Sequence, residues 1–487
     1  MTTLKQLIKL WIFSASMILW LLLPAFTHLV WAEAPGDSNS TAPDHDSSGI
    51  LPFLSGMCRC NNMLGDRWGG LRPVLGGYGV SLSLLETSEV LGNVSGGVRQ
   101  GFEYDGSTYG VLQIDTKKAF GLYGGTFNAS ALQIHGRNLS TDNLLVLQSA
   151  SGIEAWRSTR LWELWYQQQF DKADAYDVKI GQQSLDQEFM VSQNALLFVN
   201  AMFGWPMLPA ADLPAGGAAY PLASLGIRLR THIPTTPWTF LTGVFSGSPV
   251  KNNAGDPLDS SGTSFALNTG ALAIAEVQYA YPPSGAGQNG KGQLPRVYKL
   301  GFWYDTEGFS DQRFDDTGSS LSKPESTEIP RTHGGDYAIY AVLDQTIWQQ
   351  VSEPGRTLNV FVRAMGTPLT DRNTVDFSMN AGITFKEPFL HRCCDSFGLG
   401  VGYAHVSSQA AAFDRDANFF NNSALPVRSG ETVVEATYQY QITPWWQAQP
   451  DFQYFFNPGG GIPNPDSSSG ERVKNEAVIG LRTTITF

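Results

Sequence analysis

The amino-acid sequence predicts an all-β chain that closes into a transmembrane barrel of about 16 antiparallel strands. Three observations lead to this prediction. Short segments in which apolar and polar residues alternate recur along the chain, as in strands that are half buried. Long and short connections alternate between these segments. The chain ends "VIGLRTTITF", in which Ile479, Leu481 and Ile485 share one face with the terminal Phe487.

The composition fits a barrel better than a soluble protein or a bundle of membrane helices. Charged residues make up 16% of the 487 residues, whereas about 25% is usual for soluble domains. The mean hydropathy is −0.15, and after the N-terminus no run approaches the roughly 18 apolar residues of a membrane helix. The formal net charge of −12 argues against a nucleic-acid partner, because phosphate binding needs clustered Lys and Arg.

The first 32 residues, 1–32, predict a secretory signal peptide. Two lysines precede an apolar run over 10–23, and Val30 and Ala32 supply the small residues that come before a cleavage site. An N-terminal membrane anchor is the alternative. The next stretch, 33–77, is expected to be a periplasmic segment that is disordered at first and ends in a short helix or turn.

Sixteen segments with a period of two are the expected strands of the barrel, which spans 78–487. In the segment that begins near residue 224, Ile227 and Leu229 alternate with Arg228 and Arg230, so each pair occupies its own face. The sixteen segments begin near residues 78, 107, 124, 159, 175, 224, 237, 270, 296, 335, 357, 376, 396, 431, 445 and 473.

The connections alternate in length as in an outer-membrane β-barrel, with long external loops and short periplasmic turns. The sheet must close, because every backbone group at lipid depth has to be paired. A soluble all-β sandwich is the alternative, but the signal peptide, the alternation and Phe487 favour the barrel. One connection, 281–295, is long where a short turn is expected. The other long connections are 136–158, 184–223, 247–269, 306–334 and 407–430, and the short ones include 171–175, 234–237 and 443–444.

The connection 184–223 is the expected constriction of the pore. A barrel of about sixteen strands leaves an aqueous channel, so selection requires a segment that folds inward. This connection holds "NALLFVNAMFGWPML", which is apolar enough to pack inside the barrel. An ordinary external loop is the alternative.

Seven motifs in chain order resemble the carbohydrate-selective porins of the OprB family, and they span most of the chain after the signal peptide. The resemblance implies a single-chain barrel in the bacterial outer membrane through which glucose-like monosaccharides diffuse passively. The motifs are "LGDRWGGLRPVLGGYGVSL" (64–82), "ETSEVLGNVSGG" (86–97, at the first external loop), "RLWELWYQQ" (160–168), "GQQSLDQEF" (181–189), "FVNAMFGWP" (198–206), "YPLASLGIRLR" (220–230) and "ITPWWQAQPDFQYFFNPGG" (442–460).

Other functions compete with a sugar-selective porin. A general or anion-selective porin would carry more Arg than acidic residues at its constriction. An outer-membrane barrel hydrolase and a structural barrel with a plugged lumen are further alternatives. The sequence has no Gly-x-Ser-x-Gly elbow and no phosphate loop, and its seven histidines show no metal-ligand spacing. We therefore expect no catalytic residue, no metal and no cofactor.

Side chains that face the lumen are expected to hold the sugar, which needs aromatic faces to stack on and charged or amide groups for its hydroxyls. Glu163 and Trp165 are expected to point inward and Trp162 outward, unless the register slips by one residue. Together with Arg228 and Arg230, Glu163 and Trp165 are the candidates for the constriction itself. A solvated lumen wall is the alternative role. The expected lining is Glu163, Trp165, Gln167, Asp186, Glu188, Arg228, Arg230, Arg363, Asp451 and Gln453.

The four cysteines of an exported protein can form disulfides, and four cysteines allow three pairings. In the predicted topology Cys58 and Cys60 precede the first strand, and Cys393 and Cys394 lie in a periplasmic turn. A bridge between the N-terminal segment and this turn is the hypothesis, and unpaired thiols are the alternative. A zinc site would need histidines at finger spacing, which the sequence lacks.

The expected partners follow from this interpretation. They are small carbohydrates in the lumen, outer-membrane lipids around the wall, and the barrel-assembly machinery, which would bind the terminal strand that ends at Phe487. The sequence leaves open whether the protein is a monomer or a trimer.

Overall fold

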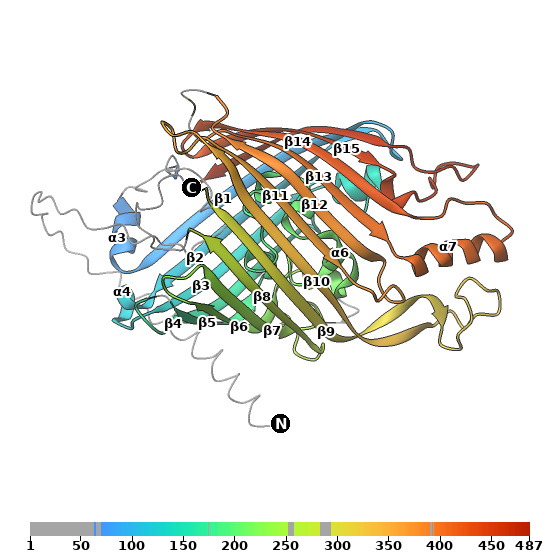
Figure 1. The fold of residues 1–487 in the computed structure, drawn as a ribbon, viewed down its shortest axis with the longest axis horizontal. Helices are drawn as coiled ribbons and strands as arrows, with labels where there is room; N and C mark the ends of the chain where they lie inside the picture. Colours follow the sequence, from blue (N-terminus) through green and yellow to red (C-terminus); the bar gives the residue numbers. More distant parts are fainter. Residues whose placement is uncertain are drawn as a thin grey trace, which may run out of the picture. The chain divides into compact units, whose positions relative to one another are not determined.

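Sixteen antiparallel strands of the described residues close into one barrel (Figure 1). The computed structural model describes residues 63–64, 70–173, 175–251, 258–282, 294–389, 392 and 394–487. Each strand pairs with its neighbour in the chain, and the first strand pairs with the last. The strands are β1 (Val80–Ser95), β2 (Gly101–Asp115), β3 (Gly125–Gly136), β4 (Ser158–Gln169), β5 (Tyr176–Gln183), β6 (Ser224–His232), β7 (Trp238–Ser246), β8 (Ala271–Tyr281), β9 (Arg296–Asp315), β10 (Pro330–Gln349), β11 (Thr357–Gly366), β12 (Val375–Lys386), β13 (Ser396–Val406), β14 (Gly430–Thr443), β15 (Trp446–Phe456) and β16 (Glu476–Thr486).

Helices are short and lie in the connections between strands. Among the described residues, no helix combines the length and the apolar character that crossing a membrane requires. The predicted signal peptide, 1–32, lies outside the described residues, as does most of 33–77. The helices are α3 (Leu71–Gly77), α4 (Thr116–Phe120), α5 (Ala201–Gly204), α6 (Met207–Asp212) and α7 (Ser408–Phe420), and single helical turns cover Ser140–Leu144, Leu185–Gln187, Ala195–Leu197, Pro214–Gly216 and Pro458–Gly460.

The prediction of a barrel of about sixteen antiparallel strands is confirmed, but two predicted connections are wrong. The segment 86–97, expected in the first external loop, belongs to β1 up to Ser95, where its backbone pairs with β2 and β16. The expected loop 306–334 is mostly strand, because β9 and β10 continue well beyond the length of their neighbours. In both segments the backbone pairing of the sheet continues through residues whose polar side chains had suggested a loop.

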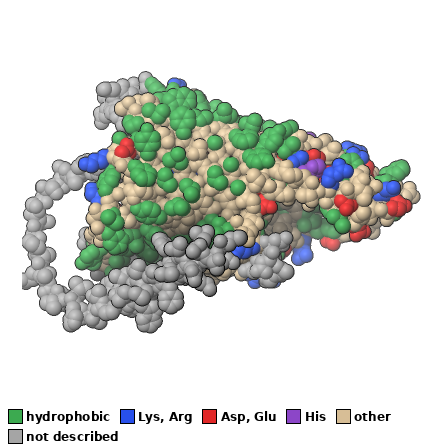
Figure 2. Space-filling model, turned by 90° about the horizontal axis from the view of Figure 1, so that it is seen from below, with side chains coloured by type: hydrophobic (Ala, Val, Ile, Leu, Met, Phe, Trp, Pro, Cys, Tyr) green, Lys and Arg blue, Asp and Glu red, His purple; other side chains and the backbone are tan. Residues whose placement is uncertain are grey.

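The two faces of the wall differ as expected of a barrel in a membrane. In β15 the outward Phe452 and Phe456 are exposed, whereas the inward Gln447, Gln449 and Gln453 are buried inside the barrel. Figure 2 shows hydrophobic side chains spread over the outer wall, while most Lys, Arg, Asp and Glu side chains gather toward one end of the view. The aromatic side chains of this strand therefore face outward, and its amides face inward.

Pro450 lies in the middle of β15, where its missing N–H would normally break a ladder. The β14–β15 ladder has a gap at this point, since pairing passes from Thr437↔Asp451 to Tyr440↔Ala448. On its other side Pro450 remains opposite Leu481 of β16. Pro450 thus lies where the ladder between β14 and β15 is interrupted, so β14 requires no backbone hydrogen bond from it.

Part of the inner wall is apolar, and the connection between β5 and β6 (184–223, here called the infolded segment) packs against this part. Trp303 of β9 and Tyr340 of β10 are almost fully buried in this contact. Burial of so many apolar side chains outweighs the entropy lost by ordering the connection. The wall contributes Leu241, Phe245, Leu272, Ile274, Trp303, Ala338, Tyr340, Val342, Met365, Val375 and Ala404, and the infolded segment contributes Leu185, Phe189, Met190, Met202, Trp205, Met207, Leu208, Leu213, Ala218 and Ala219.

Replacement of Trp303 tests this internal core. Trp303→Ala leaves a cavity between β9 and the infolded segment, and we expect it to lower the free energy of unfolding by about 3–5 kcal/mol. The adjacent Phe302 points outward and is 42% exposed, so Phe302→Ala is a matched control with a smaller expected loss. Urea unfolding in detergent micelles, followed by tryptophan-independent circular dichroism, measures both. Equal losses would contradict the internal core.

Candidate functional site

Carboxylates on the inner wall bind backbone N–H groups of the infolded segment. Glu276 of β8 accepts a hydrogen bond from the Met190 N–H at 2.8 Å. Asp344 of β10 accepts from the Ser192 hydroxyl at 2.7 Å and from the Asn194 N–H at 3.3 Å. Such charge-assisted bonds are stronger than neutral ones, so they fix the first half of the segment against the wall.

A third carboxylate holds the tip of the segment on the opposite side of the barrel. Glu435 of β14 accepts the Val199 N–H at 2.6 Å and the Asn200 N–H at 3.1 Å. On β15 the Gln449 amide donates to the Leu197 carbonyl at 2.7 Å. The infolded segment therefore crosses the lumen from β8 and β10 to β14 and β15.

Arg363 of β11 binds carbonyl groups of the same segment. Its guanidinium is almost fully buried and donates to four main-chain oxygens and to the Asn380 side chain. Five donors in a planar fork suit this multiple contact. The four carbonyls and their distances from Nη1 or Nη2 are Met190 (3.0 Å), Gly204 (2.9 Å), Met202 (2.6 Å) and Phe203 (2.9 Å).

The inward face of β13 is lined with glycine where the segment comes closest. A Cβ atom built on Gly400 would lie 2.7 Å from the Phe198 ring and 2.8 Å from the Phe203 ring. These two rings stack on each other at 4.4 Å between centroids. Any larger residue at Gly400 would displace them.

The connection between β3 and β4 also folds inward, although it was predicted as an external loop. Its Gly152 N–H donates to the Val199 carbonyl at 2.8 Å, and the Ala201 N–H donates to the Ser149 carbonyl at 3.0 Å. Glu431 of β14 accepts two further N–H groups of this connection at 2.8 Å each. Two connections thus meet inside the barrel and narrow it together.

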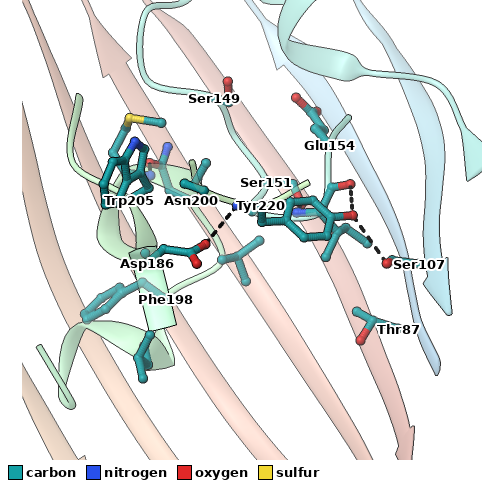
Figure 3. Close-up of a pocket in the computed structure, with 18 of the residues that line it drawn as sticks. Thr87, Ser107, Ser149, Ser151, Glu154, Asp186, Phe198, Asn200, Trp205 and Tyr220 are labelled. Atoms are coloured by element: carbon teal, nitrogen blue, oxygen red, sulfur yellow. Dashed lines mark hydrogen bonds between the residues drawn. The ribbon is translucent and has the colours of Figure 1, made fainter. Parts of the chain in front are cut away.

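A cavity of about 460 Å³ remains between the two connections and the opposite wall (Figure 3). Aromatic side chains of Trp162, Trp205 and Tyr220 line it. Hydroxyl and amide groups form the other part of its surface. Among them are the side chains of Thr87, Ser107, Ser149, Ser151, Asn194, Asn200, Gln439, Gln447 and Gln449. The lining therefore offers both apolar faces and neutral hydrogen-bonding groups.

Four charged side chains among the described residues line this cavity, two acidic and two basic: Glu154, Asp186, Lys386 and Arg482. Arg482 of β16 forms an ion pair with Glu89 of β1, with 2.8 Å between Nε and Oε2. Its charge is thereby largely compensated by the wall. The two carboxylates of the lining, Glu154 and Asp186, belong to the β3–β4 connection and to the infolded segment, respectively.

Asp186 positions Tyr220 at the edge of the cavity (Figure 3). Its Oδ2 accepts the Tyr220 N–H at 2.9 Å, and its Oδ1 accepts the Ser184 hydroxyl at 2.6 Å. The Tyr220 hydroxyl in turn donates to the Ile153 carbonyl at 3.2 Å and lies 3.3 Å from the Ser107 hydroxyl. Burial raises the pKa of Asp186, against these hydrogen bonds.

Glu154 is half-buried at the rim of the cavity. Burial raises the pKa of Glu154 to about 7, and the Glu89 carboxylate acts in the same direction, against a hydrogen bond from the Ser140 N–H. The side chain therefore changes its charge near neutral pH.

The predicted residues of β4 to β6 form a compact charged cluster at the base of the infolded segment. The Lys179 ammonium lies 4.1 Å from the centre of the Trp165 ring and 2.5 Å from Glu188 Oε1. Arg228 bridges Glu188 and Asp177. Burial alone would raise the pKa of Glu188, but the charges of Lys179 and Arg228 hold it at about 2. The cluster fixes the start of the segment to the wall.

The other predicted residues of this region share the same partners. Glu163 accepts the Ser184 N–H at 3.1 Å, Gln167 donates to Asp177 at 3.0 Å, and Arg230 pairs with Asp177. Within the described part of the chain, Asp186 is the one residue of the predicted lining that borders the 460 Å³ cavity.

Three predicted residues lie farther along the wall. Arg363 binds the infolded segment, as described above. Gln453 donates to the Ala150 carbonyl at 2.7 Å and to Asp451 at 2.8 Å. Asp451 and Gln453 are buried beneath the two connections. Whether any of these residues contacts a sugar stays a prediction.

Trp162 was expected to face outward and instead points into the barrel. Its indole N–H donates to the Leu222 carbonyl at 3.2 Å, and its ring packs edge-on against Tyr109 and Tyr220. The cause is a bulge in β4, which places two residues, Trp162 and Glu163, opposite the single Ser130 of β3. The alternation is therefore shifted by one position before Glu163.

Several wall residues that hold the constriction were missed. Asp177, Glu276, Asp344 and Glu435 occupy inward positions of their strands, as the period of two places them. A single acidic residue on a largely apolar inward face, such as Glu276, was the available signal. The backbone group that Glu276 binds comes from a distant part of the chain, so no pattern in the sequence around Glu276 indicates this contact.

Two further sequence expectations concern cysteines and metals. Cys394, in the turn between β12 and β13, is disulfide-bonded. Cys58, Cys60 and Cys393 lie outside the described residues. Within the described ranges, no group of three or more His, Cys, Asp or Glu side chains is arranged to hold a metal ion.

Comparison with known proteins identifies the family. The family model "Carbohydrate-selective porin, OprB family" matches residues 99–487. The chain belongs to the OprB family. Porin B of Pseudomonas aeruginosa is similar to it, with 26% identity over 449 residues that cover 87% of this chain and 91% of that protein.

Two solved structures of Pseudomonas putida OprB have the same fold. The high-pH structure superposes with a TM-score of 0.74 at 23% identity and covers 88% of this chain and 99% of its own. The low-pH structure gives a TM-score of 0.51 at 17% identity, with the same coverage. The protein is thus a carbohydrate-selective porin of the bacterial outer membrane, and the relatives that it matches are porins rather than enzymes.

Loss of the Arg363 guanidinium should release the infolded segment. Arg363→Met keeps an unbranched side chain close in size to the aliphatic part of Arg363 but leaves four buried carbonyls unpaired, at about 1–3 kcal/mol for each group that finds no substitute. We expect a larger single-channel conductance in planar bilayers and a lower thermal stability. Arg356→Met is the control, because Arg356 binds Gln350 and the Pro388 carbonyl away from the segment. Unchanged conductance of Arg363→Met would contradict this role.

The charge of Glu154 should make ion selectivity depend on pH. At about pH 8, one unit above its pKa, Glu154 is mostly ionised, and at about pH 6 it is mostly protonated. Because protonation removes a negative charge from the cavity, the cation-to-anion permeability ratio should fall as the pH decreases across this range. Reversal potentials in a KCl gradient measure this ratio. Glu154→Gln should give a low and nearly constant ratio, and a ratio as pH-dependent as that of the wild type would contradict the assignment.

Proposed function

We propose that this porin lets small neutral carbohydrates, glucose-like monosaccharides, diffuse passively through the cavity beside the infolded segment. One observation carries the proposal: the two inward connections reduce the barrel to a cavity of about 460 Å³ that is lined by aromatic rings, hydroxyls and amides. A sugar ring has apolar C–H faces and a rim of hydroxyls, so this lining offers a partner for each.

The charges of the cavity support a neutral solute. Glu154 and Asp186 are balanced in number by Lys386 and Arg482, and Arg482 is already paired with Glu89. A fixed excess of cations, which a general anion-selective channel would need, is not part of this lining. Passive diffusion along the concentration gradient of the sugar is part of this proposal.

The cluster of Lys179, Glu188 and Arg228 supports transport indirectly in this proposal. Its ion pairs hold the start of the infolded segment in place, and so they set the width of the cavity. Glu163 and Trp165 take part in the same contacts. Assembly of the barrel through the terminal strand remains part of the proposal, since the Phe487 N–H closes onto the Leu84 carbonyl at 2.8 Å.

Reconstitution in liposomes tests the proposed function. We expect swelling in isotonic glucose, slower swelling in gluconate because of its charge, and little in a trisaccharide because of its size. Trp205→Leu removes an aromatic face of the cavity and should reduce glucose flux by about two- to tenfold. Trp238→Leu is the control, because Trp238 is the first residue of β7, lies outside the cavity lining and is 42% exposed. Equal rates for all three solutes would contradict the proposal.

A further inference from the structure

Two carboxylates face each other on the inner wall, toward the external end of β9 and β10. Asp305 of β9 stands directly opposite Asp336 of β10. Both side chains point into the barrel, because each lies two positions from a residue of the internal core, Trp303 in β9 and Ala338 in β10. The exposed fraction of each carboxylate residue is 0%. Like charges directly opposite on one face of a sheet destabilise it unless another group compensates them.

No cation among the described residues forms an ion pair with these two carboxylates. Arg372 comes near, since it donates to the carbonyl of Gly335, the neighbour of Asp336 in the chain, at 2.6 Å. Its guanidinium pairs with Asp371 instead, with 2.9 Å between Nε and Oδ1. The buried charge of Asp305 and Asp336 therefore has to be compensated in another way.

Each of the two carboxylates has one oxygen that is hydrogen-bonded and one that is not. Asp305 Oδ1 accepts the Glu307 N–H at 2.8 Å, and Asp336 Oδ1 accepts a side-chain N–H of Asn373 at 2.9 Å. The Oδ2 atoms of Asp305 and Asp336 are buried and have no hydrogen-bond partner within the described residues. Buried polar atoms are normally satisfied, so these facing oxygens indicate a partner from outside the chain.

Asn373 brings a neutral oxygen to the same place, from the connection between β11 and β12. Its exposed fraction is 0%, and its amide nitrogen binds Asp336 as described. Its Oδ1 is a third buried oxygen that lacks a hydrogen-bond partner in the described part of the chain. Leaving an amide oxygen unsatisfied costs free energy. Asn373 thus points, independently of the acidic pair, to a ligand that binds oxygen atoms.

The connection between β7 and β8 approaches Asp305 closely. A Cβ atom built on Gly247 would lie 2.8 Å from Asp305 Oδ1 and 2.4 Å from the Thr269 carbonyl oxygen. Glycine at this position lets main-chain and carboxylate oxygens come together. Glu307 adds a further carboxylate next to Gly247, with its Cγ 3.0 Å from the same Cβ position. The surroundings of the facing pair are therefore built from oxygen atoms.

We propose that Asp305, Asp336 and Asn373 bind a hard divalent cation, calcium. Calcium takes about six to eight oxygen ligands from carboxylates, amide and main-chain carbonyls and water, in a flexible geometry. Magnesium requires a nearly ideal octahedron, and softer transition metals prefer imidazole or thiolate ligands. The proposed set holds two acidic side chains and an amide, so it differs from the groups of three His, Cys, Asp or Glu side chains that the described ranges lack.

A calcium ion at this place joins three separate parts of the chain. β9 and β10 contribute the carboxylates, and the β11–β12 connection contributes Asn373. The next residue, Thr374, donates its N–H to Asp212 of α6 at 2.7 Å. Because α6 belongs to the infolded segment, the ion stabilises an anchor of this segment together with the outer end of the wall.

Thermal unfolding of the full chain, refolded in detergent, tests the site. Refolded protein carries no lipopolysaccharide, so calcium bound to lipid does not contribute. Millimolar calcium chloride should raise the unfolding midpoint of the wild type by about 2–5 °C relative to EDTA, because a ligand of the folded state stabilises it. D305N should abolish this shift, and its midpoint in EDTA should exceed that of the wild type, because the repulsion between facing carboxylates is removed.

Asp316→Asn is the matched control. Asp316 lies just beyond the end of β9, is exposed, and accepts the Thr327 hydroxyl at 2.5 Å. It belongs to the same hairpin but not to the proposed set, so its calcium-dependent shift should equal that of the wild type.

Terbium luminescence gives a second measurement of the same site. Trp303 lies two positions from Asp305 on one face of β9, about 7 Å along the strand, so its excitation should sensitise Tb³⁺ bound there. We expect calcium to displace the terbium, and D305N and D336N each to reduce the sensitised emission about tenfold or more.

Two outcomes would overturn the proposal. One is a wild type with the same midpoint in calcium and in EDTA, which would mean that the pair shares a proton or binds water. The other is a folded D305N protein that keeps the calcium shift or the terbium emission, which would place the ion elsewhere. If D305N does not fold, D336N is measured in its place, and the same result would count against the site.

Discussion

The central constraint on this structure is that a chain segment folded into a closed barrel must find partners for its backbone polar groups on the inner wall. The strands satisfy their own N–H and C=O groups in the ladder, so the partners have to be side chains. Glu276, Asp344 and Glu435 accept N–H groups of the infolded segment, and Arg363 donates to its carbonyls. These four residues come from β8, β10, β14 and β11, so the segment is held from several directions at once. The position of the pore is a consequence of this attachment.

The same attachment divides the interior into two halves with different chemistry. Where the segment packs, the wall of β7 to β13 is an apolar core like that of a soluble protein. Where it does not, the wall of β1 to β4 and β14 to β16 keeps its hydroxyls, amides and compensated charges around the cavity. In the proposed function, selectivity comes from one wall and one edge of the segment, and not from a ring of equivalent side chains.

The sequence predicted the barrel well because strand periodicity is a local property. Starts such as those at residues 224, 296, 357 and 396 coincide with observed strands. The faces of Arg228 and Glu163 were also predictable, since the period of two fixes them. The role of those residues was not, because it depends on where residues 184–200 come to lie. Trp162 was misplaced by a bulge that no alternation reveals, and the inward path of the β3–β4 connection depends on Glu431, more than 280 positions away.

The sequence order of the anchoring residues has a consequence for biogenesis. The infolded segment precedes Glu276, Asp344, Arg363 and Glu435 in the chain, and the contact between Val199 and Glu435 spans 236 positions. During synthesis and export the segment is therefore complete long before its binding sites exist. Contacts of such separation form late in folding. The attachment of the infolded segment can therefore be completed only after β14 has joined the sheet, so the narrowing of the lumen depends on the C-terminal strands.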